Sequence, residues 1–498
     1  MVRRTGFKKE ELERCLSSPI MKKVLRGSTG SFSIRYLFIN EYINYINQQQ
    51  SNSKYMPVIN PPGSFNPGSL ATLAKRIIGR KRCEPVDILF ISRNRQVKVK
   101  VGSRYVVGDY IFYSIIDEIT RRYPEYKIHL LILDYSYNKY MYLTIKSFLE
   151  ASYISLRSFA EWSFYKGRLL ADQECYDCGY LASYFFHPRI FLRNALLGYS
   201  LNKMIELLHP KVIVANDDCI YTRPLGTDAK TIVLQSARMS EYLERCRKYI
   251  FHDPEIKPDY FLTSGTSFSR IKEEVQAAKR VVTTGLPRYD VLFYASESYS
   301  KPEFFQRYNI NPNHRIVYWS TQCHVLSDEE NSANFQEVFG AMKQLKNVTL
   351  VIKQHPAEDE SHTQAIRTHM DDFDINAIIA PRDSDTYEQL FICDLLITKA
   401  STTAMEAVAL KKPVIILNLS GEPDSVEYVR EGVARGVYEA GRLLFAIEQL
   451  LRSDSDLAAH RDGYIERYLY KVDGKATERV VEIITRLLSN ASPYDDAK

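Results

Sequence analysis

Short, unbroken runs of apolar residues alternate along the chain with longer segments in which apolar residues return at every third or fourth position. The first pattern is typical of buried strands and the second of amphipathic helices. The predicted strands are residues 87–92, 127–134, 211–216, 231–235, 259–263, 280–284, 315–320, 348–353, 377–380, 395–397 and 414–417. Because helical segments separate most of them and polar residues follow their ends, the pattern predicts an α/β fold with doubly wound parallel sheets.

The stretch of residues 394–418 shows this pattern most clearly. Its first strand is followed by Ser401, Thr402 and Thr403, which are residue types favoured at the N-cap of a helix. Pro413 ends the helix, and a second apolar strand follows. Unpaired N–H groups and the helix dipole make such a helix start suitable for an anion. The stretch therefore predicts a phosphate site, with an ordinary well-capped βαβ unit as the alternative.

The pattern also divides the chain of 498 residues, which is long enough for two or three domains. Residues 1–80 read as a helical, polar extension. Loop-type composition rich in Asn, Pro and Gly places a boundary between it and the first strand. We expect residues 81–290 to form an N-terminal Rossmann-like acceptor domain and residues 291–455 a second, nucleotide-binding one. Residues 456–498 are expected to be helices that pack back across the cleft between the two domains.

Composition adds few constraints. An apolar content of 45% and a charged content of 25% are those of a folded soluble protein, and no apolar run is long enough to span a membrane. A net charge of +6 permits an anionic substrate or a membrane surface and does not indicate nucleic acid. Cys175 and Cys178 form one C-x-x-C without a second pair at zinc spacing, so we expect no metal, reduced thiols and a cytoplasmic location.

Residues 137–208 are predicted to be helical and are rich in aromatic side chains, with basic residues interspersed over 184–193. A buried helix whose arginines extend to the surface explains this composition. The alternative is a segment that touches a membrane or a lipid acceptor.

Two doubly wound domains that face each other form a cleft at the carboxyl ends of their strands, where ligands bind. The polar residues after the strands of the second domain are Thr321, Gln322, Lys353, His355, Ser401, Thr402, Thr403, Glu406, Ser420, Glu422 and Asp424. Such a set of cation, imidazole and hydroxyl groups suits a phosphate ester. The chain has neither a P-loop nor a G-x-G-x-x-G motif, which disfavours ATP hydrolysis and nicotinamide chemistry.

Two of these residues have specific candidate roles. His355 stands at a strand end before Pro356, where it can donate to a leaving phosphate; the alternative is a hydrogen-bonded plug of the strand end. Glu406, one turn into its helix, can accept two ribose hydroxyls, as an acidic residue does in dinucleotide folds; the alternative is a solvated helix carboxylate.

The order and spacing of three motifs resemble those of GT-B glycosyltransferases of bacterial surface polysaccharide assembly. The motifs are Thr284-Gly285-Leu286-Pro287-Arg288-Tyr289-Asp290, Lys353-Gln354-His355-Pro356 and Ser401-Thr402-Thr403-Ala404-Met405-Glu406-Ala407. The chain is similar to capsule Kdo transferases, bacterial polysialyltransferases and CDP-glycerol glycerophosphotransferases over about residues 210–420. In those groups a His-Pro motif and a Ser-Ser or Ser-Thr motif hold the cytidine nucleotide. A further segment of those groups usually closes Gln-His-Gly, and here it closes Gln235-Ser236-Ala237, without the histidine.

The resemblance implies a metal-independent transfer of a nucleotide-activated sugar (CMP-, CDP- or UDP-linked), or of glycerol phosphate, to a surface glycan or glycolipid. The general base would come from the first domain, and by position the candidates are Asp217 and Asp218, followed by Asp109 and Asp134. The residues that the resemblance and the strand-end positions assign to the donor are Gly285, Arg288, Thr321, Gln322, Lys353, His355, Pro356, Ser401, Thr402, Thr403 and Glu406. Arg93 and Arg95, in the first strand-end loop, can bind an anionic acceptor.

Two other functions fit the same pattern. A sugar-nucleotide 2-epimerase has this fold but needs several carboxylates around the sugar ring and no acceptor groove. A non-catalytic scaffold that binds nucleotides or glycans would fit the missing histidine. For the transferase we expect a nucleotide-activated sugar and a glycan acceptor as partners, and a peripheral position at the inner face of the membrane.

Overall fold

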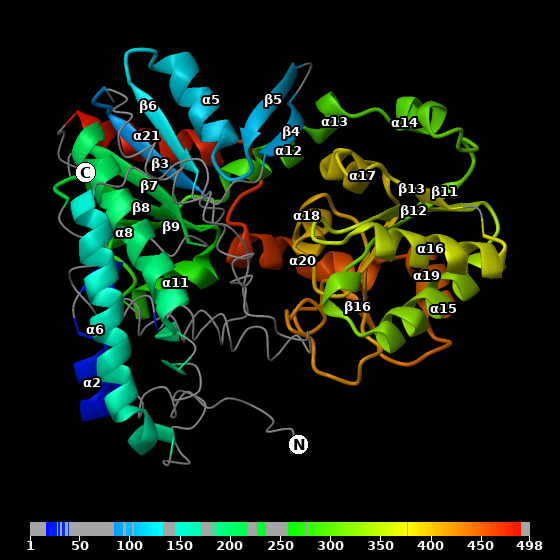
Figure 1. Ribbon diagram of the computed structural model, residues 1–498. Coiled ribbons are helices and arrows are strands. Elements are labelled where there is room, and N and C mark those ends of the chain that lie inside the picture. The colour runs from blue at the N-terminus through cyan, green and yellow to red at the C-terminus, as the bar shows by residue number, and fades with distance from the viewer. Residues whose placement is uncertain are drawn as a thin grey trace.

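The computed structural model has two lobes, each built on one six-stranded sheet (Figure 1). The residues that the structure describes are 16–26, 28–29, 32–34, 38, 84–92, 96–101, 104–132, 145–170, 182–183, 185–217, 227–235, 257–274, 276–375 and 377–489.

The sheet of the first lobe has the strand order β6-β3-β7-β8-β9-β10, and all its pairs are parallel. Its strands are β3 (Ile88–Ser92), β6 (Ile128–Ile132), β7 (Val212–Asn216), β8 (Lys230–Leu234), β9 (Tyr260–Thr263) and β10 (Arg280–Thr283). Strand β3 lies between β6 and β7, the next two strands of this sheet in the chain. The strand order therefore reverses at β3, which is where open α/β sheets place their ligand crevice.

Helices cover both faces of this sheet. They are α2 (Pro19–Val24), α5 (Tyr113–Arg122), α6 (Ile145–Leu170), α8 (Pro188–Leu208), α11 (Thr266–Glu274) and α21 (Ala476–Leu488). Successive side chains of a strand point to opposite faces. Ile88 and Phe90 accordingly share a core with α5 and α21, whereas Leu89 and Ile91 share another with α2, α6 and α8. Burial on both faces explains why the strands read as unbroken apolar runs in the sequence.

The sheet of the second lobe has the order β13-β12-β11-β14-β15-β16, and again all pairs are parallel. Its strands are β11 (Arg315–Ser320), β12 (Val348–Lys353), β13 (Ile378–Ile379), β14 (Leu395–Thr398), β15 (Val414–Leu417) and β16 (Arg435–Val437). Its main helices are α14 (Lys301–Arg307), α15 (Asp328–Gln344), α16 (Glu360–Phe373), α17 (Thr386–Ile392), α18 (Thr403–Ala409), α19 (Leu443–Arg452) and α20 (Ser455–Tyr468). The predicted pair of doubly wound parallel sheets is confirmed.

The sequence prediction missed a two-stranded antiparallel hairpin between the lobes, formed by β4 (Gln96–Val101) and β5 (Arg104–Asp109). We expected only a loop after the strand of residues 87–92, and in the structure β4 begins at Gln96. Valines alternate with polar residues along β4, a strand signal that the interpretation as a loop overlooked. Val99 is buried in the core of the second lobe, so the hairpin carries chain from the first lobe onto the second.

Apart from this hairpin, the described residues pass from one lobe to the other at two places, after β10 and before α21, and the two crossings touch. The 3-10 helix η1 (Pro287–Tyr289) leads out of the first lobe, and the segment before α21 leads back. The carboxylate of Asp290 accepts hydrogen bonds from the N–H groups of Ala476 and Thr477, at 2.9 and 2.7 Å, and so caps α21. Arg479 of α21 donates to the carbonyl of Thr284 at 2.7 Å. The motif of residues 284–290 thus anchors the C-terminal helix.

A glycine permits a close approach at this junction. A Cβ on Gly265 would lie 2.3 Å from the carbonyl oxygen of Arg467, at the end of α20, so only glycine fits at this point. Helix α20 therefore rests directly against the start of α11 in the first lobe.

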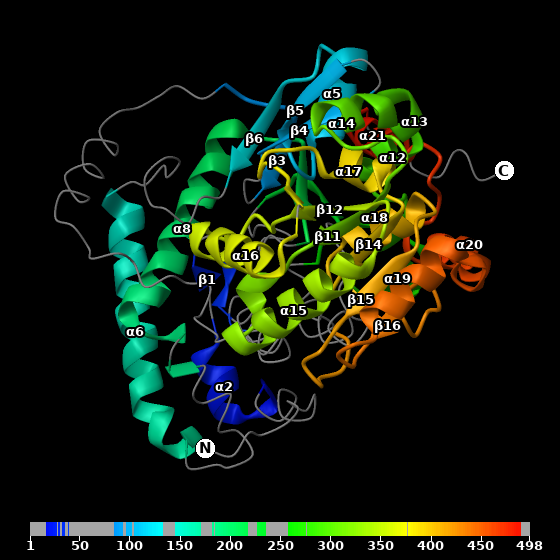
Figure 2. The same cartoon turned by 90° about the vertical axis from the view of Figure 1, so that its right-hand side faces the viewer.

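The predicted extension, residues 1–80, lies mostly outside the described residues. Its described part is not separate from the first lobe, since Met21 and Phe38 are buried in the same core as Leu89. Helices α6 and α8, which share this core, lie side by side in both views (Figure 1 and Figure 2). Phe185, Phe186 and Phe191 are fully buried there, as expected for the buried-helix interpretation. Among the described helices, none combines the length and apolar content that crossing a bilayer requires.

The cap on α21 generates a prediction about stability. Asp290→Ala removes the acceptor of two helix N–H groups at a half-buried site, and we expect it to lower the free energy of unfolding by about 2 kcal/mol. Urea unfolding followed by circular dichroism measures this change. Asp328→Ala, which removes an exposed carboxylate from the first turn of α15, is the matched control and should cost about 0.5 kcal/mol or less. Equal effects of the two substitutions would contradict the anchoring role of Asp290.

Candidate active site

The loop after β11 carries polar groups to the point where the strand order of the second sheet reverses. The N–H of Thr321 donates to the carbonyl of Lys353 at 3.0 Å, which extends the ladder by one residue beyond the strand. A single 3-10 turn, η2 (Cys323–Val325), follows. Ser327 and Glu330 then form a capping box that starts α15. The sequence thus confines Gln322 and His324 to a short, well-defined loop.

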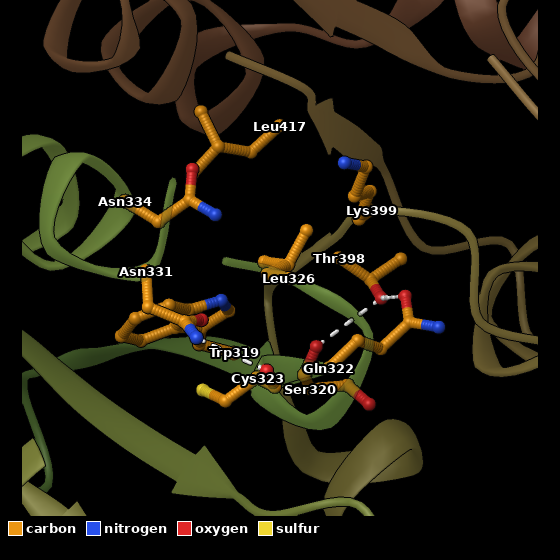
Figure 3. A pocket seen from close by; sticks show the side chains of 10 residues that line it. All are labelled: Trp319, Ser320, Gln322, Cys323, Leu326, Asn331, Asn334, Thr398, Lys399 and Leu417. Atoms are coloured by element: carbon orange, nitrogen blue, oxygen red, sulfur yellow. Dashed lines mark hydrogen bonds between the residues drawn. The ribbon is translucent and has the colours of Figure 1, made fainter. Parts of the chain in front are cut away.

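A recess with an empty volume of about 300 Å³, part of it open to solvent, lies at the ends of β11, β14 and β15 (Figure 3). It is lined by Trp319, Ser320, Gln322, Cys323, Leu326, Asn331, Asn334, Thr398, Lys399 and Leu417. Gln322 accepts a hydrogen bond from the N–H of Ala400 at 2.7 Å and so ties the β11 loop to the β14 loop. Burial lowers the pKa of Lys399, against the opposing effect of Glu330 at 3.8 Å.

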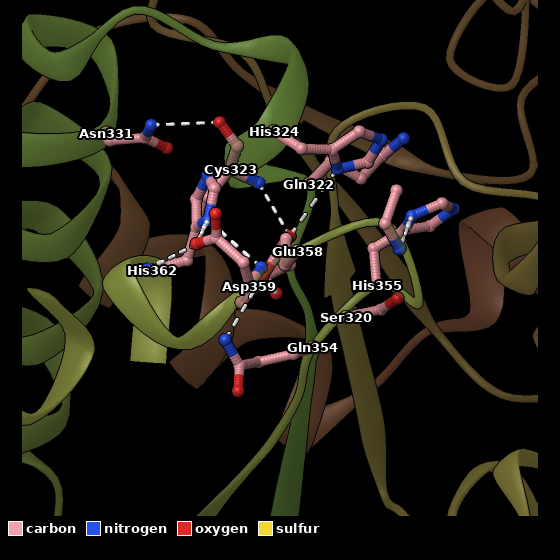
Figure 4. Close-up of polar contacts among 12 residues, drawn as sticks. Ser320, Gln322, Cys323, His324, Asn331, Gln354, His355, Glu358, Asp359 and His362 are labelled. Carbon is pink, nitrogen blue, oxygen red and sulfur yellow. Dashed lines mark hydrogen bonds and ion pairs between the residues drawn. The ribbon is translucent and has the colours of Figure 1, made fainter. Parts of the chain in front are cut away.

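Beside this loop the imidazole rings of His324 and His355 stack (Figure 4). Their centroids are 4.2 Å apart and their planes differ by 18°. The Nδ1 of His355 accepts a hydrogen bond from the N–H of Ala357 at 3.1 Å, so in the neutral ring the proton is on Nε2. The structure therefore joins the predicted His355 to a second histidine that the sequence analysis did not select.

Glu358 lies behind the two rings and is 2% exposed. Its carboxylate accepts hydrogen bonds from the hydroxyl of Thr321 at 2.8 Å and from the N–H of Cys323 at 2.7 Å, and lies 3.7 Å from Nδ1 of His324. Burial alone would raise the pKa of this carboxyl, but His324 and the two hydrogen bonds hold it below its usual value. Thr321 is thus a support for Glu358 and points into the protein.

Lys353 also points inward. Its ammonium donates to the carbonyls of Pro381 and Arg382, at 2.7 and 2.6 Å, and to the hydroxyl of Ser384 at 3.2 Å. Burial lowers its pKa to about 8, against the opposing effect of nearby carboxylates. Lys353 therefore holds the loop after β13, and its three donors have acceptors within the chain.

The helix start that the sequence singled out is closed by its own turn. The N–H of Thr403 donates to the hydroxyl of Ser401 at 3.2 Å, and that of Ala404 to the carbonyl of Ser401 at 3.1 Å. The N–H groups of Met405 and Glu406 donate to the carbonyl of Thr402, whose side chain makes no capping bond. Unpaired N–H groups at this helix start were the basis of the predicted phosphate site, and these four are paired. The phosphate site stays a prediction that rests on the side chains.

Glu406 and Arg288 lie in a buried cluster between the lobes, 2% and 3% exposed. The guanidinium carbon of Arg288 is 4.4 Å from the ring centre of Tyr110 and 4.6 Å from that of Tyr289, a cation–π arrangement on two rings. Burial raises the pKa of Glu406 to about 7, although Arg288 and a hydrogen bond with Tyr289 counteract it. The buried Nε of Arg288 and the hydroxyl of Tyr387 have no hydrogen-bond partner. The alternative of a solvated carboxylate at Glu406 is therefore wrong.

The remaining predicted residues lie in different places. Gly285 has a φ of +78°, and its Cβ position faces Ala476 of α21 at 3.3 Å, so it belongs to the crossing. Pro356 is exposed beside His355. Asp217 is 9% exposed at the carboxyl end of β7. Asp109 accepts from the N–H groups of the turn that precedes α5.

Several predicted residues lie outside the described residues: Arg93, Arg95, Asp134, Cys175, Cys178, Asp218, Ser236 and Ala237. Over the ranges that the structure does cover, no three His, Cys, Asp or Glu side chains gather as a metal site would require.

Comparison with known proteins identifies the family. The family model of CDP-Glycerol:Poly(glycerophosphate) glycerophosphotransferase matches residues 224–486, more than half of the chain. The chain belongs to this family. It is therefore a transferase that uses a nucleotide-activated donor, and the predicted resemblance is confirmed. A search of curated protein sequences finds no match.

Two solved structures are similar to this glycerophosphotransferase family member. The wall teichoic acid polymerase TagF aligns with a TM-score of 0.47 and 12% identity, covering 97% of this chain and 99% of that one. UDP-GlcNAc 2-epimerase from Neisseria meningitidis aligns with a TM-score of 0.50 and 13% identity, covering 80% of this chain and 100% of that one. At this identity the alignment with the epimerase concerns the fold alone, which is the predicted GT-B arrangement.

Sequence reasoning missed three residues of this family member's candidate site: His324, Glu358 and Lys399. Each stands in a strand-end loop already selected. His324 and Glu358 lie two residues beyond Gln322 and Pro356, and Lys399 lies two residues before Ser401. The signal was therefore the whole loop and not only the polar residues selected in it.

The pKa of Glu406 predicts how stability depends on pH. Folding raises this pKa from 4.5 to about 7, so the folded state binds the proton more tightly than the unfolded state. The resulting stabilisation is complete below pH 4.5 and is lost as the pH rises through 7. We expect Glu406 to account for a fall of roughly 2–4 kcal/mol in the free energy of unfolding over that window.

Urea unfolding of wild type and Glu406→Gln at several pH values measures this contribution as the difference between the two curves. Glu448→Gln, at an exposed carboxyl on α19, is the matched control and should run parallel to wild type. Parallel curves for Glu406→Gln as well would refute the raised pKa.

Proposed function

We propose that the chain transfers a sugar or a polyol phosphate from a cytidine-nucleotide donor, CMP- or CDP-linked, to a hydroxyl of a surface glycan or glycolipid, without a metal ion. The observation that carries the proposal is a continuous strip of polar groups across the carboxyl ends of β11, β12 and β14. The strip runs from His355 over His324 to Gln322 and the N–H of Ala400. Membership in the glycerophosphotransferase family supports the cytidine nucleotide.

The strip suits the departing phosphate. When the acceptor oxygen attacks the transferred group, the bond to the nucleotide phosphate breaks and its electron pair stays on the phosphate oxygen. Imidazole N–H groups that face this oxygen stabilise the developing charge most when they are fixed in advance. The stacking of His355 on His324 fixes both rings in this way. The recess beside Lys399 shares Gln322 with this strip, so the two adjoin.

The acceptor hydroxyl must lose its proton to a base of the first lobe. Asp217, at the carboxyl end of β7, is the candidate that the described residues offer, together with Asp218 from the sequence. The absence of a histidine at Ser236 makes a carboxylate the more suitable base in this chain.

Helix α6 supports an acceptor that lies at a membrane. The side chains of Leu149, Tyr153, Leu156 and Phe164 are 61–74% exposed along it. Their spacing in steps of three, four and eight residues places them on one side of the helix. An exposed apolar stripe of this kind suits the interface of a bilayer, and a glycolipid acceptor would then be within reach.

Nucleotide binding tests the donor class. In thermal-shift measurements with CMP, CDP, UMP, UDP and GDP, we expect CMP and CDP at about 100-fold above their Kd to raise Tm by about 2–5 °C. His355→Ala should abolish most of the shift, as should Glu406→Ala, the proposed ribose ligand. His314→Ala, which replaces a half-buried histidine at the amino end of β11, is the matched control and should keep the shift.

The other outcomes of this experiment separate the alternatives. Stabilisation by uridine nucleotides alone would favour the sugar-nucleotide 2-epimerase, whose fold the chain shares. Stabilisation by a nucleotide without transfer to any glycan would favour a binding scaffold. If none of the five nucleotides shifts Tm, the proposed donor site is wrong.

Metal independence has its own test. Transfer from the stabilising donor should proceed at an unchanged rate, within about twofold, after dialysis against EDTA, because fixed imidazole donors take the part of a cation. Loss of activity in EDTA that Mg²⁺ or Mn²⁺ restores would overturn this part of the proposal.

A further inference from the structure

Two neighbouring residues of one turn hold the two stacked rings. The N–H of Ala357 donates to Nδ1 of His355 at 3.1 Å, and the carboxylate of Glu358 lies 3.7 Å from Nδ1 of His324. The turn itself is closed by a hydrogen bond from the N–H of Glu358 to the carbonyl of His355 at 2.9 Å. The turn thus engages Nδ1 of both rings. In each ring Nε2 is the nitrogen on the side that faces away from this contact.

The surroundings of the two rings differ. The carboxylate of Glu358 lies 3.7 Å from Nδ1 of His324. This Nδ1 is buried and has no hydrogen-bond partner among the described residues. At His355 the corresponding atom faces the backbone N–H of Ala357. A carboxylate therefore faces His324, whereas a backbone donor faces His355.

The carboxylate cannot turn away from His324. Thr321 and the N–H of Cys323 each hold one of its oxygens, at 2.8 and 2.7 Å. Gln354 donates to it at 3.5 Å and is itself held by the hydroxyl of Thr363 at 2.8 Å. A buried charge with so many supports is costly to build, because ionised groups lose their hydration. Capping of α16 does not explain Glu358, because the neighbouring Asp359 caps that helix.

From this arrangement we propose that His324, positioned by Glu358, is a second imidazole of the donor site and binds the phosphate of the departing nucleotide beside His355. This rests on the proposed function and names a residue that the sequence motif does not contain. His324 donates to a phosphate oxygen through Nε2 while its Nδ1 faces the carboxylate of Glu358, and its stacked ring keeps His355 in place. Glu358 is a positioning residue that acts through His324.

The substitution that tests this inference is His324→Phe, which keeps a flat ring to stack on His355 but removes both ring nitrogens. Dissociation constants are measured for CDP and for cytidine, which lacks the phosphates. A charged hydrogen bond to phosphate contributes a factor of about ten or more, so CDP should bind at least about tenfold more weakly, and cytidine should bind as in wild type.

Glu358→Gln tests the positioning role. It retains the shape of the side chain and removes its charge, and we expect it to weaken CDP by a smaller factor, about three- to tenfold, again without an effect on cytidine. In the transfer reaction both variants should lower kcat more than they raise KM, because charge on the phosphate grows as the bond breaks.

The matched control is His369→Phe. His369 lies on a later turn of α16 and is also half-buried. Its ring packs against that of Phe335, with the two centroids 4.8 Å apart. CDP binding should be unchanged in this variant. Circular dichroism and Tm without nucleotide verify that each variant is folded. Should His324→Phe fail to fold, His324→Leu, which also lacks an N–H donor, takes its place with the same expectation.

The outcomes are distinct from those of the proposed function. If wild type binds neither CDP nor CMP, the donor site itself is wrong. If wild type binds CDP and His324→Phe binds it equally well, or loses cytidine and CDP to the same extent, the phosphate-binding role of His324 is overturned while the donor site stands.

Discussion

The two crossings of the chain between its lobes constrain everything else in the molecule. The outgoing crossing ends in Asp290, and the returning one ends in α21, and the carboxylate of the first caps the helix of the second. Arg479 links the same helix to the carbonyl of Thr284 and pairs with Asp473 at 2.9 Å. Because α21 fills one face of the first sheet, this junction joins the core of the first lobe to the start of the second.

The junction also explains the burial of charged groups nearby. Arg288 follows Gly285 by three residues, and its guanidinium lies between aromatic rings that come from both sides of the crossing. An arginine in such a place loses hydration and regains part of that free energy from the ring faces. Glu406 shares the same enclosed space, which is the physical reason for its raised pKa.

The strand ends of the second sheet follow a different principle. Here the polar side chains form layers, in which inner groups hold outer ones. Thr321 and Cys323 hold Glu358, which holds His324, which stacks on His355. Lys353 holds the loop after β13 in the same manner. Such support limits the movement of the outer groups, and catalysis by fixed donors depends on that limit.

The sequence by itself determined most strands of the two sheets, their parallel arrangement and the motifs, because apolar runs and strand-end residues are local features. It correctly placed Gln322 and His355 in the loops after two strands, and Glu406 in the helix that follows a third. Tertiary structure alone decided the direction of each side chain: Thr321 and Lys353 turn inward, and the N–H groups after Ser401 close on their own turn. It also decided which residues meet, since the stacking of His324 on His355 joins two loops that are 31 positions apart in the chain. No local pattern encodes such a contact, because it depends on the pairing of β11 with β12.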